Sequence, residues 1–159
     1  MDFLLSDISL HPETAADDAF LRNLHASGRI AGLAVAPWTN GQKAAFINQQ
    51  FDLQRHHYRT YYPTADFLIV KLANQPVGRF YLHRGEMAWL LIDIALLPEC
   101  QGHGIGGLLL KNMLADAATL NKPVRLHVGQ SNRAQELYLR LGFTVIEDKG
   151  IRCLMEWRP

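Results

Sequence analysis

Four glycines gather in the short segment Gln101–Gly107, between an apolar run that ends at Pro98 and a run with helical spacing. Glycine lets the backbone turn tightly and come close to a ligand, because no Cβ stands in the way. The N–H groups in the first turn of a helix point outward, and the helix dipole favours negative charge there. The segment therefore predicts an anion site, and a pyrophosphate is its natural ligand.

A dinucleotide is one ligand that such a loop could hold. Gly102, Gly104 and Gly107 satisfy the pattern G-x-G-x-x-G. That motif usually follows the first strand and has an acidic residue about 20 positions further on. Here it follows a third or fourth strand, and the next predicted strand ends in Gly129-Gln130 instead. A dinucleotide-binding oxidoreductase is therefore the alternative with less support, and no Gly-Lys-Ser/Thr follows that would indicate a P-loop.

The elements around the loop alternate between strand-like and helical patterns, which is typical of a mixed α/β domain. Strands are predicted over 2–9, 67–72, 77–83, 87–97, 124–128, 143–147 and 151–157. Helices are predicted over 17–26, 42–58, 104–120 and 132–141. Asn74-Gln75-Pro76 predicts a turn that closes a hairpin. Since only Asp93 is charged in 87–97, that segment is interpreted as a central strand buried on both faces.

Two motifs carry a resemblance to a known family. The stretch from Leu96 to Gly106 resembles the acetyl-CoA signature of the GCN5-related N-acetyltransferases (GNAT), Gln/Arg-x-x-Gly-x-Gly/Ala, with Gln101, Gly104 and Gly106 at its fixed positions. The stretch from Asn132 to Phe143 is similar to the family's second motif. The resemblance implies one GNAT-type domain over residues 1–159. Its fold would be a mixed, mostly antiparallel, splayed sheet of six to seven strands with about four helices.

The resemblance also implies where acetyl-CoA binds as a cosubstrate. Backbone N–H groups of the loop would hold the CoA pyrophosphate: Gln101, Gly102, His103, Gly104, Ile105, Gly106 and Gly107. In this family the strand before the loop separates from the strand after the helix. The pantetheine arm then lies in the gap as a strand would, against the backbone of Ile94, Ala95 and Leu96. Asn132 would reach the pantetheine or its neighbourhood, and no metal is expected.

Tyr138 is the candidate general acid. It matches the family tyrosine that often protonates the departing CoA thiolate, and a thiolate leaving group needs a proton donor nearby. Tyr138 also lies on the apolar stripe of its predicted helix. A core tyrosine with a satisfied hydroxyl is therefore the alternative interpretation.

Asp93 is the first candidate for the general base. A carboxylate within an apolar strand is costly unless it has a purpose or a partner. The alternative is a structural carboxylate held by hydrogen bonds. The family often carries an acidic residue further back on this strand, and this chain has Leu90 there. Further candidates for the base are Glu86, His83 and His127.

The N-terminal half covers the acceptor side in similar proteins. It contains aromatic residues that would line an acceptor pocket or pack in the core: Trp38, Tyr58, Tyr61 and Tyr62. His56 and His57 are adjacent, so on a helix their side chains point about 100° apart, which suits a shared metal poorly.

Composition narrows the class of protein further. The 159 residues carry a net charge of +1, so no basic excess indicates nucleic acid as a partner. The longest apolar runs are shorter than the roughly 18 residues of a membrane span. Cys100 and Cys153 form no CxxC pair, which favours a cytoplasmic location.

The prediction is an N-acetyltransferase that moves an acetyl group from acetyl-CoA directly to a primary amine of a small molecule or peptide. The alternative is a non-catalytic acyl-CoA-binding module, and homodimers are common among similar proteins.

Overall fold

The computed structural model describes residues 4–130 and 132–159 of the chain. Within them, seven strands form one sheet in the order β1-β2-β3-β4-β5-β7-β6. The strands are β1 (Ile8–Pro12), β2 (Asp66–Leu72), β3 (Gln75–Arg84), β4 (Trp89–Leu96), β5 (Val124–Gly129), β6 (Thr144–Asp148) and β7 (Arg152–Trp157). Of the described pairs, β4 with β5 is parallel and the others are antiparallel.

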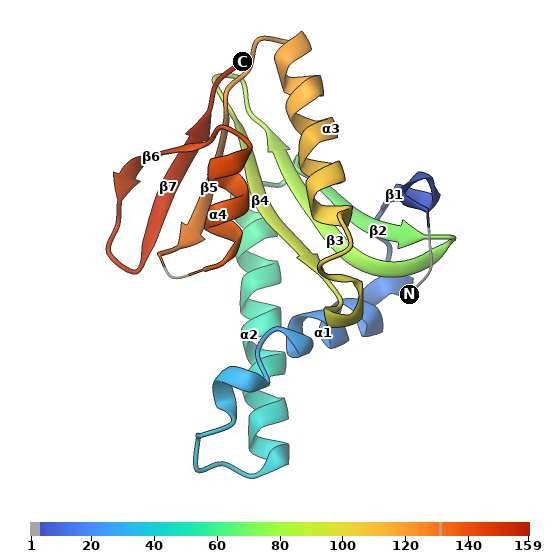
Figure 1. Ribbon diagram of the computed structural model, residues 1–159. Helices are drawn as coiled ribbons and strands as arrows, with labels where there is room; N and C mark the ends of the chain where they lie inside the picture. The colour runs from blue at the N-terminus through green and yellow to red at the C-terminus, as the bar shows by residue number, and fades with distance from the viewer. Residues whose placement is uncertain (1–3, 131) are drawn as a thin grey trace.

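Helices cover both faces of this sheet, as Figure 1 shows. They are α1 (Asp18–Ser27), α2 (Asn40–Tyr61), α3 (Ile105–Thr119) and α4 (Ala134–Arg140). Helices α3 and α4 lie in front of the sheet and α2 lies behind it, while α1 contacts α2 and β3. This arrangement confirms the predicted mixed α/β fold with a mostly antiparallel sheet. We call the two sides of the sheet the α3/α4 face and the α1/α2 face.

The two faces have different interiors. The larger hydrophobic core belongs to the α3/α4 face and includes Phe80, Leu82, Leu110 and Met155. The core of the α1/α2 face consists of Leu21, Phe51 and Ile69, with Phe20 beside them. Because successive side chains of a strand point to opposite faces, a strand that sends Phe80 and Leu82 to the larger core sends the intervening residues to the other side. The α1/α2 face therefore receives the polar side chains of β3.

The hairpin turn between β2 and β3 lies one residue earlier than predicted. Ala73 and Asn74 form it, with φ angles of 49° and 68°, and Leu72 pairs with Gln75. Two consecutive positive φ angles are typical of the tight hairpin turn whose twist matches that of the strands. Pro76 lies inside β3, beside a register shift at Val70/Lys71, where a residue without an N–H is tolerated.

Two predicted strands differ from the structure in extent. The first strand was expected over 2–9 but runs over Ile8–Pro12, after a short 3-10 turn at Leu5–Asp7. Asp2 and Phe3 lie outside the described residues. The expected burial of 87–97 on both faces is wrong at both ends, since Met87 is 85% exposed and every residue from Ile92 to Leu96 is half-buried. That stretch pairs with β3 on one side, and its pairing with β5 on the other side ends at Leu91.

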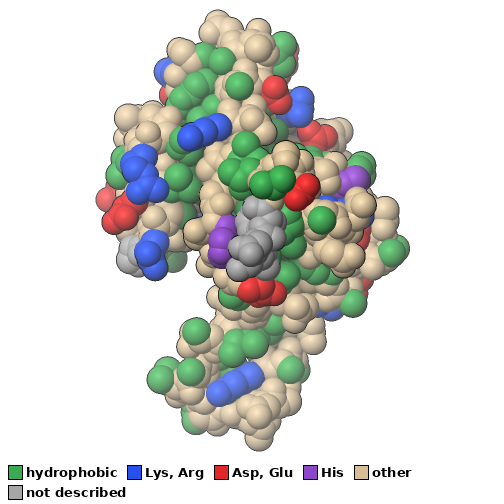
Figure 2. All heavy atoms as spheres, turned by 45° about the vertical axis from the view of Figure 1, so that its right-hand side comes forward, with side chains coloured by type: hydrophobic (Ala, Val, Ile, Leu, Met, Phe, Trp, Pro, Cys, Tyr) green, Lys and Arg blue, Asp and Glu red, His purple; other side chains and the backbone are tan. Residues whose placement is uncertain are grey.

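The connection between α1 and α2 forms an arm that stands off the sheet. Figures 1 and 2 show this connection and the first half of α2 below the body of the molecule. Trp38 packs its ring against Phe46 of α2 at 5.1 Å between centroids, which holds the arm together. Ile30 and Val35 are exposed there. No helix among the described residues is long and apolar enough to cross a membrane.

Candidate active site

The sheet opens between β4 and β5. These strands pair over only three positions, Trp89 with Val124, Leu90 with Arg125 and Leu91 with Leu126. Beyond Leu91, β4 continues to Leu96 without a partner on that side. The same point carries a β-bulge, because Leu82 pairs with Leu91 while Tyr81 pairs with Asp93, which leaves Ile92 unpaired. A bulge bends its strand and increases the local twist, so it turns β4 away from β5. The predicted separation of the two strands is thus present.

Backbone groups of β4 line this opening. The N–H of Leu97 donates to the carbonyl of Val77 at 2.8 Å, so Leu97 and, two residues back, Ala95 point their polar groups toward β3. Ile94 and Leu96 then point theirs into the opening. Of the three residues predicted to face the pantetheine arm, Ile94 and Leu96 have this orientation. The polar groups of Ala95 point toward β3, although all three residues lie opposite a residue of that strand.

The glycine loop closes one end of the opening, directly before α3. Gly102 and Gly104 adopt φ angles of 77° and 88°, a region that residues with a Cβ rarely enter. Gly104 is the N-cap of α3, and its carbonyl accepts from Leu108 N–H at 3.1 Å. Leu108 is thus the first residue whose N–H bonds within the helix. The N–H groups of the three residues before it, Ile105 to Gly107, have no partner within the helix.

The space above this loop is open. A Cβ placed on Gly102, Gly106 or Gly107 would meet no atom within 4 Å. A ligand can therefore approach the backbone directly, and the positive end of the α3 dipole lies behind it. The sequence predicted an anion site here, and the geometry of a helix start with unused donors fits a pyrophosphate.

Side chains brace the loop from within. Gln101 donates from Nε2 to the carbonyl of Leu96 at 3.0 Å, which ties the loop to the end of β4. Nδ1 of His103 lies 2.8 Å from the carbonyl oxygen of Gln101. Cys100, beside the loop, is buried, and burial raises the pKa of its thiol first of all. A buried thiol with a raised pKa is a poor nucleophile, so the structure offers no support for a covalent acyl-enzyme at Cys100.

Asp93 follows the bulge and lies on the α1/α2 face. It pairs across the strands with Tyr81, and its Oδ2 lies 2.5 Å from Nη2 of Arg79. The Arg79 side chain is 6% exposed and the Asp93 side chain 23% exposed. The sequence left open whether this carboxylate has a partner, and Arg79 is that partner. No described residue donates a hydrogen bond to Oδ1 of Asp93, so this oxygen is available to a ligand.

Tyr138 approaches the opening from the other face. It lies in α4 and packs on Phe143 at 5.7 Å between ring centroids. Burial raises the pKa of Tyr138 to about 12, and the negative charge of Asp93 adds to the rise. Asp93 and Tyr138 are therefore close enough to interact electrostatically although they belong to opposite faces. The phenol stays protonated at neutral pH, as a proton donor must.

The second predicted motif forms the start and end of α4. Oδ1 of Asn132 accepts from Ala134 N–H at 2.9 Å, so part of this side chain orders the helix start. Gly142 ends the helix with a φ of 100°, and Phe143 N–H donates to the Tyr138 carbonyl at 3.0 Å. This is the pattern of a Schellman C-cap. Ser131 lies outside the described residues.

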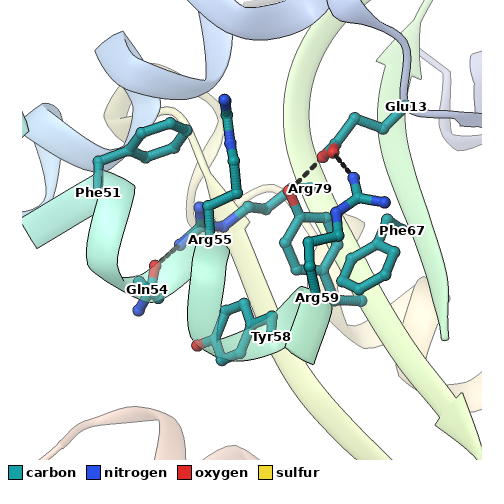
Figure 3. A pocket seen from close by; sticks show the side chains of 9 residues that line it. Glu13, Phe51, Gln54, Arg55, Tyr58, Arg59, Phe67 and Arg79 are labelled. Carbon is teal, nitrogen blue, oxygen red and sulfur yellow. Dashed lines mark hydrogen bonds and ion pairs between the residues drawn. The ribbon is translucent and has the colours of Figure 1, made fainter. Parts of the chain in front are cut away.

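The aromatic residues of the N-terminal half separate into different environments. Tyr58 lies on the last turns of α2 and lines a small pocket above β2 and β3, shown in Figure 3. Tyr61 is 67% exposed, and Tyr62 packs on His83 at 5.3 Å between centroids. Trp38 belongs to the arm described above. Of the four predicted aromatics, Tyr58 shares a pocket with Arg79, and its pKa is raised to about 12, by burial and then by the charge of Asp93.

The pocket in Figure 3 is a closed charge network. Glu13 accepts from the Tyr81 hydroxyl and forms an ion pair with Arg59, while Arg79 donates to Gln54 at 3.2 Å. Burial, and then the hydrogen bond to Glu13, raise the pKa of Tyr81. Because these contacts join α2 to β3 and to Glu13, which follows β1, the network serves to hold α2 on the sheet.

Sequence reasoning missed Arg79. The signal for it was present, because Arg79 and Tyr81 share one face of a strand and Asp93 is the sole charge in the next strand. An arginine on that face could have been matched to the aspartate. The remaining candidates for the base lie apart from Asp93 in the strands: His83 pairs with Leu90 and His127 with Leu154, while Glu86 lies in the turn before β4. Among the described residues, no three His, Cys, Asp or Glu side chains gather as metal ligands would.

Comparison with known proteins agrees with this geometry. The family model of the acetyltransferase (GNAT) domain matches residues 63–145, which is more than half of the chain. This protein belongs to the GNAT acetyltransferases. No curated protein sequence matches it significantly. The mostly antiparallel sheet also differs from the parallel sheet that a dinucleotide-binding fold requires.

Solved structures share the fold at low sequence identity. The PaiA N-acetyltransferase of Thermoplasma acidophilum, solved in complex with coenzyme A, is 19% identical with a TM-score of 0.72, over 96% of this chain and 99% of that one. An acetyltransferase of Thermus thermophilus is 20% identical with a TM-score of 0.71, over the whole of both chains. A chimera of the spermidine N-acetyltransferases of Vibrio cholerae and human is 21% identical with a TM-score of 0.65, over 96% of this chain and 95% of that one.

Proposed function

We propose that this protein transfers an acetyl group from acetyl-CoA directly to a primary amine. One observation carries the proposal: β4 and β5 separate beyond Leu91, between the unused donors at the start of α3 and Asp93 on β4. A pyrophosphate would accept from the N–H groups of the loop from Gln101 to Gly107. The pantetheine arm would lie along Ile94 and Leu96 as a neighbouring strand does. Asn132 would contact the arm from the other side, with the part of its amide that the helix start leaves unused.

Acetyl-CoA supplies an activated acyl thioester when bound. The chain's own residues would then move two protons. Oδ1 of Asp93 takes a proton from the acceptor ammonium, directly or through one water, so that the nitrogen lone pair can attack the acyl carbon. As the new C–N bond forms and the C–S bond breaks, Tyr138 donates its hydroxyl proton to the leaving sulfur. The second proton then leaves the new amide nitrogen for solvent, and solvent returns a proton to the Tyr138 phenolate.

A thiol-release assay tests the proposal. Acetyl-CoA is incubated with the protein and with a panel of primary amines, and the free CoA thiol is measured. Release that depends on an amine, with the acetylated amine detected by mass spectrometry, is the expected result. Binding of acetyl-CoA without release for any amine would favour the non-catalytic acyl-CoA-binding module. Preferential binding of NADH over acetyl-CoA in a titration would contradict the proposed ligand.

A further inference from the structure

Cationic side chains gather on the α1/α2 face beside the opening. Cys153 and Met155 of β7 belong to the larger core on the other face, so the alternation of the strand places Arg152 and Leu154 on the α1/α2 face. Arg152 pairs with Gly129 and Leu154 with His127, which are residues of β5 beyond its last contact with β4. One wall of the opening on this face is therefore formed by β5 and β7.

Lys149 adds a second cation to this wall. It lies in the turn between β6 and β7, and its Nζ is 3.3 Å from Nε2 of His127. Its N–H donates to the carbonyl of Arg152 at 2.9 Å, which keeps the two residues together. Burial lowers the pKa of His127, with Lys149 and Arg152 contributing and Glu147 opposing. His127 is thus a neutral ring between two cations.

Arg29 and Arg79 approach from the opposite wall. Arg29 follows the end of α1, and Arg79 reaches across from β3. Burial and the charge of Asp93 raise the pKa of Tyr58. The positive charges of Arg79, Arg29 and Arg152 lower it. The charges of Arg29, Arg79 and Arg152 thus all act on one hydroxyl, which the charge of Asp93 also affects.

Among the described residues, Arg29, Lys149 and Arg152 differ from the other cations on this face in lacking carboxylate partners. Arg22, Arg55 and Arg59 all form ion pairs further along α1 and α2. No ion pair to a described carboxylate forms at Arg29, Lys149 or Arg152, and Arg79 has Asp93. Two buried side chains also keep unused hydrogen-bonding atoms, Nε of Arg79 and both ring nitrogens of His25. His25 is 4% exposed and Arg79 is 5% exposed, so water does not satisfy them readily.

We propose that the acceptor is a small amine that also carries an anionic group, a carboxylate or a phosphate, which Lys149 and Arg152 bind while Asp93 receives the ammonium. The inference rests on the proposed function. The arrangement offers one available carboxylate oxygen and several unpaired cations, which complements a zwitterion. A polyamine would bring further positive charges against the same cations and would be disfavoured.

Matched pairs of acceptors test this inference with the full-length protein and acetyl-CoA. Each pair differs in the anionic group: β-alanine with β-alaninamide, and phosphoethanolamine with ethanolamine, with spermidine as a polycation. We expect kcat/KM to be at least about tenfold higher for the anionic member of a pair, since charge-assisted hydrogen bonds of this kind contribute that much. Which pair shows the larger ratio distinguishes a carboxylate from a phosphate.

Variants test which cations cause the preference for anionic acceptors. The double variant Lys149→Gln/Arg152→Gln should bring the ratio close to one, by lowering kcat/KM for the anionic acceptors and leaving neutral amines nearly unchanged. Arg140→Gln is the matched control, because it removes a cation from α4 on the other face and should keep the ratio. Preference for spermidine or for the neutral amines would overturn the inference and leave the proposed function standing. Binding of acetyl-CoA with no turnover of any acceptor would overturn both.

Discussion

Arg79 and Asp93 form an ion pair across β3 and β4, with 2.5 Å between Nη2 and Oδ2, directly beside the bulge that opens the sheet. Asp93 can therefore be both a structural carboxylate and a general base. Its Oδ2 holds Arg79, while its Oδ1 is available to a ligand. Removing one partner of a buried pair leaves an uncompensated charge, which costs about 3 to 5 kcal/mol. Stability and catalysis must therefore be separated in any test of this residue.

Asp93→Asn should lower kcat about 100-fold or more, as expected for loss of a general base, and should also lower the free energy of unfolding. The double variant Asp93→Asn/Arg79→Gln removes both charges, so we expect it to regain much of the stability in urea unfolding and to stay slow in the thiol-release assay. If the double variant regains normal turnover, Asp93 is a structural carboxylate and not the base.

Gly106→Glu should weaken acetyl-CoA binding by about 100-fold or more, because it places a negative charge at the start of α3 where the pyrophosphate would lie. Gly106 is preferable to Gly104 for this test, since Gly104 has a φ of 88° and any side chain there would strain the backbone. Isothermal titration gives the dissociation constant. Gly32→Glu, which also meets open space but lies in the arm between α1 and α2, is the control and should bind normally. Equal affinity of Gly106→Glu and wild type would refute the placement of the pyrophosphate.

Tyr138→Phe should lower kcat about 100-fold and leave the dissociation constant of acetyl-CoA nearly unchanged, since it removes one proton donor and keeps the packing on Phe143. The pKa of about 12 means that Tyr138 is protonated throughout the neutral range, so its loss should lower the rate evenly from pH 6 to 9. Tyr61→Phe removes a hydroxyl from an exposed ring and serves as control. Normal turnover of Tyr138→Phe would leave it as a core tyrosine.

His25 should make the fold sensitive to acid. Burial lowers its pKa from 6.5 to about 4, and Arg29 and Arg79 contribute. Between these values the unfolded chain binds the proton and the folded one does not, so stability is complete above pH 6.5 and is lost as pH falls toward 4. The total is about 3 kcal/mol at most. His25→Gln should flatten the dependence of the unfolding free energy on pH in that range, whereas His56→Gln, an exposed control, should not. An unchanged slope in His25→Gln would show that other groups cause the dependence.

Strong local patterns made most of the fold predictable. The spacing of Ile105, Leu109 and Met113 gave α3 to within a residue at either end, and the φ preferences of glycine located the loop before it. The hairpin turn was displaced by one residue because Asn74 and Pro76 both favour turns and the sequence does not decide between them. The bulge at Ile92 leaves no pattern in composition, so the half-buried second part of β4 was not foreseen.

The part of the site that is formed by backbone groups was predictable. The part that depends on contacts between side chains was less so. The loop residues follow from glycine and from the ends of helices, which are local properties. The partner of Asp93 depends on the register between two strands, and that register shifts by one residue at the bulge. The unpaired state of Arg152 and Lys149 depends on the whole surrounding surface. Such a property exists only after the chain has folded.

The three paired positions between β4 and β5 have a mechanical consequence. The strands β1 to β4 and β5 to β7 are in effect two sheets that share one short seam, from Trp89/Val124 to Leu91/Leu126. A strand-like ligand along Ile94 and Leu96 would lengthen that seam with bonds that the protein itself does not make. Binding of acetyl-CoA would then also join the two halves of the sheet. The halves could move relative to each other in the unbound protein and would be held together in the bound one.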